Sequence, residues 1–339
     1  MSYQPIEVVS TLGMDRETWL EYRRKGIGGS DVAAILGFSP FCTARDIYYD
    51  KAGIKPAVQT EENWVALEYG HALEELVAKI FSFKTGYRVF KREILFAHPK
   101  HPFLQANVDY FYETPRGETG ILECKTTDSE SLEKWEDGAA PYNYELQCRH
   151  YLYIMGLQTA FIACLYGNNE NKFLYRKIEQ DPHYETGIVP HLEYFWNHHV
   201  LDNAPPPYTE SGKLVMQSIQ KYFGNGDPNQ AGAVLDPKLI PVMKEYLRLS
   251  EKKKKAAKKL SDLENQLQQL SGVVADKMGA SCEAVCDTAS ERYVATYALS
   301  KRVGILKNNL ERLKLEHPDI YDEYASTTQF RKFTIRKEG

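Results

Sequence analysis

The sequence predicts an α/β fold, with a mixed central sheet flanked by helices, followed by a C-terminal long-helix arm and a small α+β appendage. Two observations support the α/β part: helical and strand-like patterns alternate along residues 63–179, and the strand-like runs are short and separated by turn residues. A third observation supports the arm, because a run of prolines at 205–207 is followed by a long heptad pattern.

Composition limits the classes of function. The 339 residues carry a net charge of −4, which excludes a uniformly basic nucleic-acid binder and leaves local patches and bound cations for any such contact. The N-terminus has no basic leader, and no window is apolar enough to span a membrane, so we expect a cytoplasmic protein without membrane contacts. The six cysteines form no CxxC pair, which argues against a zinc ribbon or a disulfide framework. Cys282 and Cys286, four residues apart, are either half of a metal site or, as we expect, buried small apolar residues.

The first elements are short helices from residue 15 to about residue 49, interrupted by "GIGGSD". The glycines permit a tight backbone, and Ser30 or Asp31 can cap the helix that follows. The free amides of a helix start favour anions, so this stretch predicts either a phosphate contact or simple capping.

The next elements build the sheet and its helices. Residues 63–84 have apolar residues at helical spacing, and three strand-like runs at 87–96, 103–113 and 120–127 are predicted to pair as an antiparallel meander. A second helix is predicted over 142–155, followed by strands at 159–167 and 172–179. The apolar face of the first helix is predicted to consist of Leu73, Leu76, Val77, Ile80 and Phe81.

The proline run divides the chain into a domain of residues 1–210 and a C-terminal part of residues 211–339. The heptad pattern predicts a long helix that packs against another helix. Its lysine-rich run, 251–259, is either a solvated face or a phosphate-contacting patch. Short strands at 292–300 and 330–337 and a helix near 303–316 complete the appendage. The seam consists of Val242, Tyr246, Leu249, Ala256, Leu260, Leu263, Leu267, Leu270 and Val274.

The stretch "GILECKTT" has the strongest chemical signal. Side chains alternate along a strand, so Glu123 and Lys125 project to the same face. An exposed ion pair there would contribute less than about 1 kcal/mol. The alternative is a catalytic pair, in which the carboxylate holds a divalent metal and the ammonium orients water or stabilises an anionic transition state.

Asp109 in "NVDYF" precedes Glu123 by one hairpin, so adjacent strands can bring both carboxylates to one edge of the sheet. Magnesium prefers several oxygen ligands and retains some water, and the two carboxylates with the main-chain carbonyl of Cys124 meet this demand. Glu74, on the preceding helix, adds a third carboxylate for a second ion. Two ions can stabilise both the attacking and the leaving oxygen of a phosphodiester.

These motifs together resemble the YqaJ-type viral recombinases, relatives of phage lambda exonuclease in the PD-(D/E)xK nuclease superfamily. The resemblance covers about half of the chain and implies a restriction-endonuclease-like core. In this chain Asn-Val precedes the aspartate, where the superfamily has a proline. The matching stretches, in order, are "WLEYRRKGIGGSDVAAILG", "EYGHALEEL", "NVDYF", "GILECKTT" and "ELQCRHYLY".

The resemblance implies a role for each matching position in the core. Asp109 and Glu123 would bind the metal, and Lys125 would position or activate the water. Glu74 would be the helix acid that assists a second metal, and Gln147 would lie beside the site.

Two further positions match the residues that bind a terminal 5′-phosphate in the family, Arg23 and Ser30. The implied function is a Mg²⁺-dependent deoxyribonuclease, with Mn²⁺ as a substitute. It would be a 5′-to-3′ exonuclease that digests one strand from the ends of linear double-stranded DNA, for phage-type single-strand-annealing recombination. A single-strand annealing protein and a homo-oligomer that encircles DNA are the implied partners.

Two alternatives remain open. An endonuclease of the same superfamily, either a restriction or a junction-cleaving enzyme, would share the carboxylates and the lysine but would not need a pocket for DNA ends. A non-catalytic DNA-binding protein on a nuclease fold is disfavoured because Asp109, Glu123 and Lys125 are all present. An iron–sulfur nuclease needs four clustered cysteines, which this sequence lacks.

Overall fold

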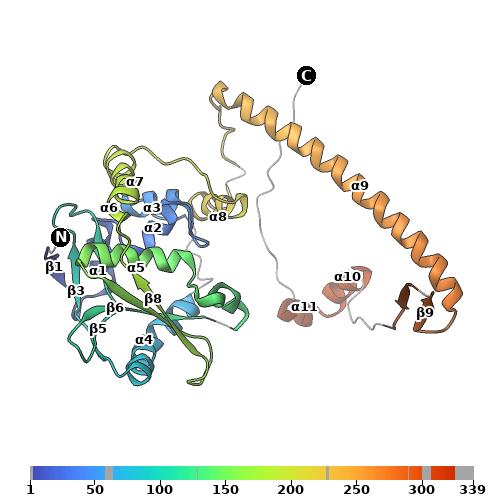
Figure 1. Ribbon diagram of the computed structural model, residues 1–339. Helices are drawn as coiled ribbons and strands as arrows, with labels where there is room; N and C mark the ends of the chain where they lie inside the picture. Colours follow the sequence, from blue (N-terminus) through green and yellow to red (C-terminus); the bar gives the residue numbers. More distant parts are fainter. Residues whose placement is uncertain are drawn as a thin grey trace. The chain divides into compact units, whose positions relative to one another are not determined.

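The computed structural model describes residues 3–57, 64–127, 129–226, 229–288, 290–299 and 307–324. The chain divides into two compact units, Met1–Gly224 and Asn225–Gly339. The helices and strands of both units are labelled in Figure 1.

The first unit contains a five-stranded sheet in the order β2-β5-β6-β7-β8. All neighbours are antiparallel except β6 and β7, which are parallel. A parallel pair needs a long crossover, and helix α5 (Tyr142–Met155) lies in that connection. The mixed central sheet predicted from the sequence is thus confirmed. Its strands are β2 (Arg88–Phe90), β5 (Tyr110–Glu113), β6 (Thr119–Thr126), β7 (Thr159–Leu165) and β8 (Phe173–Glu179).

A second sheet, which the sequence did not predict, has the order β1-β3-β4. The predicted strands at 87–96 and 103–113 are each broken into two strands. One piece of each, β2 and β5, belongs to the first sheet, and the other, β3 and β4, belongs to the second. The chain leaves the first sheet at three consecutive charged residues, Lys91–Glu93, and β3 then pairs with β1. The strands of this sheet are β1 (Ile6–Ser10), β3 (Ile94–Ala97) and β4 (Gln105–Ala106).

Helices cover both faces of the five-stranded sheet (Figure 1). On β6, Ile121 belongs to the core beneath α5, whereas Leu122 and Cys124 belong to the core beneath α4 (Trp64–Thr85). This alternation places Glu123 and Lys125 on the α5 side. Helix α4 packs on the sheet with the apolar face predicted from the sequence, except that Leu76 is 44% exposed.

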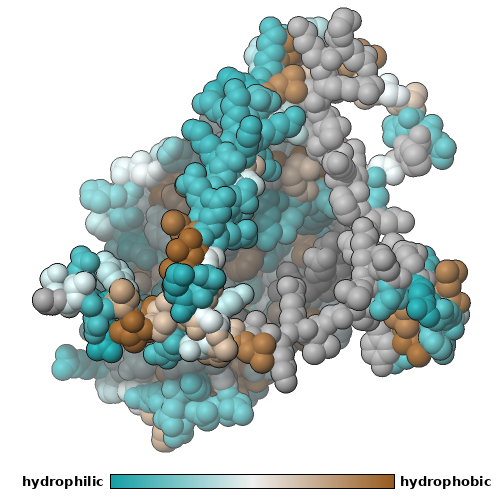
Figure 2. Space-filling view, turned by 90° about the vertical axis from the view of Figure 1, so that its right-hand side faces the viewer, coloured by the Kyte–Doolittle hydropathy of each residue, from teal (hydrophilic) through white to brown (hydrophobic). Residues whose placement is uncertain are grey.

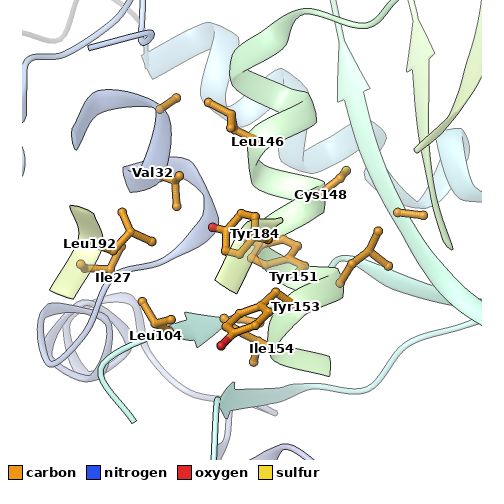
Figure 3. Packing of buried hydrophobic residues seen from close by; sticks show 14 of the residues in the cluster. Ile27, Val32, Leu104, Leu146, Cys148, Tyr151, Tyr153, Ile154, Tyr184 and Leu192 are labelled. Carbon is orange, nitrogen blue, oxygen red and sulfur yellow. The ribbon is translucent and has the colours of Figure 1, made fainter. Parts of the chain in front are cut away.

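The larger core joins α5 to the N-terminal helices (Figure 3). Ile27, Val32 and Leu104 pack with Leu146 and Ile154 of α5. The N-terminal helices are α1 (Arg16–Arg24), α2 (Gly29–Ile35) and α3 (Ala44–Lys51).

Of the two residues predicted to cap α2, Ser30 and Asp31, the structure uses Asp31. Gly28 occupies the N-cap position, and Asp31, inside the first turn, accepts a hydrogen bond from the Gly28 amide at 2.9 Å. Ser30 is therefore not the capping residue, and its hydroxyl accepts a hydrogen bond from Arg23 instead.

The first unit ends one helix later than the boundary at residue 210. Helix α8 (Gly212–Phe223) packs on α3, where Ser218 Oγ donates to Asp46 Oδ1 at 3.0 Å and the rings of Tyr222 and Tyr49 lie 4.2 Å apart. A 3-10 segment (Ser129–Gly138) lies between β6 and α5. Between the last strand, β8, and α8 lie α6 (Tyr184–Gly187), α7 (Val189–Tyr194) and a π-helical turn (Phe195–Leu201).

The second unit contains the predicted long helix, α9 (Ile240–Met278), preceded by a 3-10 turn (Pro237–Leu239). A hairpin of β9 (Glu283–Asp287) and β10 (Arg292–Thr296) follows, and then α10 (Lys307–Glu316) and α11 (Pro318–Tyr324). The predicted strand at 330–337 lies outside the described residues.

The expectation that Cys282 and Cys286 are buried is wrong. Both are exposed, because they lie on or beside an exposed hairpin strand. The surface in Figure 2 is mainly hydrophilic, with hydrophobic residues in small groups. Among the described residues, no helix has the length and apolar character needed to cross a membrane.

Candidate active site

Two carboxylates meet where β5 and β6 pair. Tyr110 pairs with Leu122, so Asp109, one residue before β5, lies across from Glu123. The main-chain amide of Cys124 donates to Asp109 Oδ2 at 2.9 Å. The hairpin therefore brings together the two acids that the sequence placed at one edge of the sheet.

Glu123 is held by two donors. Its Oε1 accepts hydrogen bonds from Lys125 Nζ and from Gln147 Nε2, each at 2.6 Å. The same Gln147 nitrogen donates to the hydroxyl of Tyr151 at 3.2 Å, which fixes the amide on the face of α5. The other oxygen, Glu123 Oε2, is buried and has no hydrogen-bond partner in the described part of the chain. A buried carboxylate oxygen without a donor is unfavourable, and a bound cation would satisfy it.

The electrostatics of these groups are coupled. Burial, followed by the charge of Asp109, raises the pKa of Glu123 to about 8. Burial also raises the pKa of Asp109, although Lys125 opposes that effect. Burial alone would lower the pKa of Lys125, but Glu123 and Asp109 outweigh it and raise that pKa above its usual range. The site therefore has more negative charge than one lysine neutralises, which favours a cation.

The donor set fits a hard divalent ion. No three His, Cys, Asp or Glu side chains among the described residues form a metal cage by themselves. Magnesium does not need such a cage, because it is commonly held by one or two carboxylates and retains several waters. Asp109 and Glu123 would provide the carboxylates for such an ion, and the Cys124 carbonyl is the predicted third ligand.

Glu74 reaches the same cavity from α4. Its Oε2 lies 3.9 Å from Lys91 Nζ, and burial followed by the charge of Asp109 raises the pKa of its carboxyl group. Glu74 is thus close enough to interact electrostatically with Asp109, but it does not form a three-ligand cluster with the other two acids.

Arg23 and Ser30 form a second group in this cavity. The guanidinium of Arg23 donates to Ser30 Oγ, and its carbon lies 5.1 Å from the centre of the Trp19 ring. Asp31 Oδ1 lies 3.4 Å from the same guanidinium. Burial would lower the pKa of Arg23, but Asp31, Tyr151 and Asp50 together outweigh burial and raise that pKa.

A fully buried lysine supports this group. Lys51 Nζ lies 2.7 Å from Asp31 Oδ2 and donates to the main-chain carbonyl of Arg23 at 3.1 Å. Burial would raise the pKa of Asp31, but the charges of Lys51 and Arg23 outweigh it and lower that pKa to about 2. Asp31 therefore stays ionised and holds both basic side chains in place.

The loop between α1 and α2 is fixed to the rest of the domain. The Ile27 amide donates to the Phe103 carbonyl at 2.6 Å, and the Gln105 amide donates to the Ile27 carbonyl at 2.8 Å. A Cβ at Gly29 would lie 2.6 Å from the ring of Tyr151, so only glycine allows α2 to approach α5 this closely. This approach brings Ser30 and Gln147 to the same cavity.

One cavity of about 400 Å³ contains every site residue predicted from the sequence. It also contains residues that were missed, among them Asn107, Asn143 and Tyr144. Tyr144 lies one turn before Gln147, a spacing that could have identified it, and Lys125 Nζ lies 5.0 Å from its ring centre. The predicted residues in the cavity are Arg23, Ser30, Glu74, Asp109, Glu123, Cys124, Lys125 and Gln147.

Comparison with known proteins identifies relatives of this chain. A family model described as the YqaJ-like viral recombinase domain matches residues 18–158. Uncharacterized protein YqaJ from Bacillus subtilis (strain 168) is 31% identical over 327 residues, which are 96% of this chain and 95% of that protein.

Solved structures with a partial likeness include two exonucleases. An alkaline exonuclease, LHK-Exo from Laribacter hongkongensis, is 16% identical, with a TM-score of 0.46, over 60% of this chain and 98% of that one. A phage-related exonuclease from Haemophilus somnus 129PT is 14% identical, with a TM-score of 0.39, over 55% of this chain and 98% of that one.

Proposed function

Because the chain belongs to the YqaJ-like viral recombinase family, we propose that it is a divalent-metal-dependent deoxyribonuclease. We propose further that it digests one strand of linear double-stranded DNA from a 5′ end, as phage-type annealing recombination requires. The observation that carries the proposal is that one cavity holds both the Asp109–Glu123–Lys125 group and the Arg23–Ser30 group. The proposal includes a restriction-endonuclease-like assignment for the mixed sheet.

Each residue of the first group has a defined task in this proposal. Asp109 and Glu123 hold Mg²⁺, or Mn²⁺ as a substitute, with the carbonyl of Cys124, and Glu74 assists a second ion. When bound, the metal supplies a Lewis acid for the phosphate oxygens and a more acidic water. Gln147 fixes the rotamer of Glu123 through its 2.6 Å hydrogen bond. Lys125, held at 2.6 Å from Glu123, places a positive charge where negative charge develops on the phosphate.

The second group explains why the substrate is a DNA end. Arginine presents a planar fork that binds two phosphate oxygens, and the hydroxyl of Ser30 beside it can donate a third hydrogen bond. Such a pocket fits a terminal phosphate, which has more free oxygens and more charge than an internal one. A homo-oligomer around DNA and a single-strand annealing protein are the proposed partners.

The test is the digestion of matched duplexes by the full chain. We expect loss of linear DNA with a 5′-phosphate in Mg²⁺, slower loss of the 5′-hydroxyl form, and no cleavage of covalently closed circles. Cleavage of closed circles would favour the endonuclease alternative. DNA binding without cleavage in either Mg²⁺ or Mn²⁺ would favour a non-catalytic protein.

A further inference from the structure

His150 is a polar side chain in the middle of α5 that has no task in the proposed function. Its exposed fraction is 0%, yet both of its ring nitrogens have partners. Nδ1 lies 2.8 Å from the hydroxyl of Tyr184, and Nε2 lies 3.2 Å from each of the main-chain carbonyl oxygens of Ile27 and Gln105. These contacts join α5 to three other segments: α6, the loop between α1 and α2, and β4.

The three partners fix the protonation state of the His150 ring. Carbonyl oxygens only accept hydrogen bonds, so Nε2 carries the hydrogen and donates to both of them. In the neutral ring Nδ1 is then an acceptor, and the hydroxyl of Tyr184 donates to it. Burial lowers the pKa of His150 to about 4, which keeps the ring neutral near pH 7. One tautomer therefore satisfies all three contacts.

The hydrogen bond from His150 to Ile27 holds the loop that carries the phosphate-binding candidates. Ile27 lies between Arg23 and Ser30 in the sequence, and Figure 3 shows it beside α5. The Ile27 carbonyl accepts from the Gln105 amide as well as from His150, so both lone pairs of this oxygen are used. A side chain of α5 thus fixes this loop against α5.

The same helix reaches the carboxylate group one turn earlier. Gln147, three residues before His150, donates to Glu123 Oε1 at 2.6 Å. Residues three apart on a helix are neighbours on one face, with about 5–6 Å between their Cβ atoms. Neighbouring positions on α5 therefore contact both parts of the cavity: Gln147 contacts Glu123, and His150 contacts the loop of Ser30.

We propose that His150 is a positioning residue that sets the separation between the loop of Ser30 and the carboxylate of Glu123. The inference rests on the proposed function, because the separation matters only if one DNA strand occupies both places at once. A terminal phosphate held by the loop would then present the scissile phosphodiester to the carboxylates. A misplacement of about 1 Å can slow a reaction on the order of a hundredfold, so a loosened loop should impair the chemistry more than the binding of the end.

The test compares His150→Leu with Ile154→Ala in the full chain. Leucine has no donor for the two carbonyls, so kcat on linear duplex with a 5′-phosphate should fall by about ten- to a hundredfold. KM should stay within about twofold, because Arg23 and Ser30 are still present to bind the phosphate. Ile154 is the matched control: it lies one turn after His150 on α5 and is equally buried, but it has no polar group to hold the loop. Ile154→Ala should lower the melting temperature and leave kcat close to the parent value.

His150→Gln is the conservative variant. Its side-chain amide has two N–H donors, one for each carbonyl, and an oxygen that can accept from Tyr184. It should recover kcat to within about threefold of the parent value. Tyr184→Phe should give a kcat between those of His150→Leu and His150→Gln, because it removes the donor that selects the ring tautomer.

Hydrogen exchange provides a measurement that does not depend on activity. In His150→Leu the amides of residues 26–30 and of Gln105 should exchange faster than in the parent, whereas those of β7 should not change. Ile154→Ala should show no acceleration confined to this loop. If the parent protein does not cleave DNA ends, the proposed function fails, and the exchange rates still decide whether His150 holds the loop.

Three results would overturn the inference. The first is a His150→Leu variant that melts at the temperature of Ile154→Ala and keeps the parent kcat, or that loses only affinity for the end. The second is a His150→Gln variant as impaired as His150→Leu, which would mean that the donor is not what matters. The third is unchanged exchange of residues 26–30 in His150→Leu.

Discussion

The two units of this chain differ most in what they bury. The first unit has two apolar cores, one on each face of its five-stranded sheet. In the second unit, Met278 is the one buried apolar residue among those that the structure describes. A chain segment with so little buried surface derives its order from local helix and hairpin bonding and from partners.

This difference in burial determines where ionisable side chains can have strongly shifted pKa values. In the first unit, Asp31, Lys51 and Glu123 are buried, so their charges act at low dielectric and their partners matter. In the second unit the ion pairs, such as Arg248 with Glu245, are exposed, and such pairs contribute little. Substitutions of buried and exposed charged residues should therefore differ widely in their effects.

The largest effect is expected for Glu123→Gln. Cleavage of linear duplex should fall by at least about a thousandfold, because the variant loses a proposed metal ligand and the partner of Lys125. Folding should not suffer: the raised pKa of Glu123 means that the folded protein disfavours its charge, so the neutral variant should melt at the same or a higher temperature.

The matched control for Glu123→Gln is Glu145→Gln. Glu145 lies on α5 but pairs with Arg149, at 2.7 Å, so its variant should cleave normally. Activity of Glu123→Gln above a tenth of the parent value, or a strongly lowered melting temperature, would contradict the assignment.

The next effect concerns the buried ion pair beneath Arg23. Asp31→Asn leaves the ammonium of Lys51 buried without its carboxylate at 2.7 Å, which should lower the free energy of unfolding by about 3–5 kcal/mol. Urea unfolding measures this loss. Asp50→Asn is the control, because Asp50 is half exposed and 3.7 Å from Lys51, and it should cost less than about 1 kcal/mol. Equal losses in the two variants would mean that burial does not distinguish these pairs.

In the parent protein, the stabilisation from the Asp31–Lys51 pair should be lost as the pH is lowered. The pKa of Asp31 is about 2 in the folded chain, against about 3.9 for an unfolded aspartate. A lowered pKa means that the unfolded chain binds the proton more tightly, so the stabilisation is complete above pH 4 and is lost as pH falls from about 4 to about 2. This contribution should be about 2–3 kcal/mol, measured as the difference in pH dependence between the parent and Asp31→Asn. Parallel pH curves would contradict it.

The sequence predicted the parts of the first unit that depend on short-range pattern. Strand alternation placed Glu123 and Lys125 on one face, and hairpin geometry placed Asp109 opposite them. The structure brings these residues into one cavity with Arg23 and Ser30. Their roles in catalysis and in phosphate binding remain predictions.

The sequence pattern could not reveal which strands or side chains pair when they lie far apart in the chain. Nothing in the run at residues 87–96 shows that β3 leaves its neighbour β2 to pair with β1, because that choice depends on a strand about 90 residues away. The partner of Asp31 is Lys51, on another helix, and no periodicity relates the two. The seam of α9 was visible in the sequence, but the helix expected to pack against it was not identified.

A smaller effect, confined to substrate choice, is expected for Arg23→Ala. Loss of one charge-assisted contact should cost roughly 1.5–3 kcal/mol, which corresponds to about a ten- to hundredfold fall in the preference for 5′-phosphorylated over 5′-hydroxyl ends. The measurement is the ratio of the two cleavage rates, because any loss of stability affects both substrates equally.

Arg24→Ala is the matched control for Arg23→Ala. Arg24 is the next residue on α1, but its guanidinium lies 3.3 Å from Asp50 and does not line the cavity. It should leave the ratio unchanged. If Arg23→Ala also leaves it unchanged, Arg23 does not hold the terminal phosphate, and the exonuclease proposal loses its main advantage over the endonuclease alternative.

The smallest effect is expected when the chain is truncated after Gly224, where the first unit ends. All cavity residues and both cores are retained, so cleavage of short duplexes should stay within about threefold of the parent rate, as for a domain with its own core. Truncation after Glu210 is the informative contrast. It removes α8, exposing the ring of Tyr49 and leaving Asp46 without the hydroxyl of Ser218, so the shorter protein should melt at a lower temperature. A folded but inactive chain ending at Gly224 would mean that the second unit contributes to the catalytic site, and the contrast between the two units would fail.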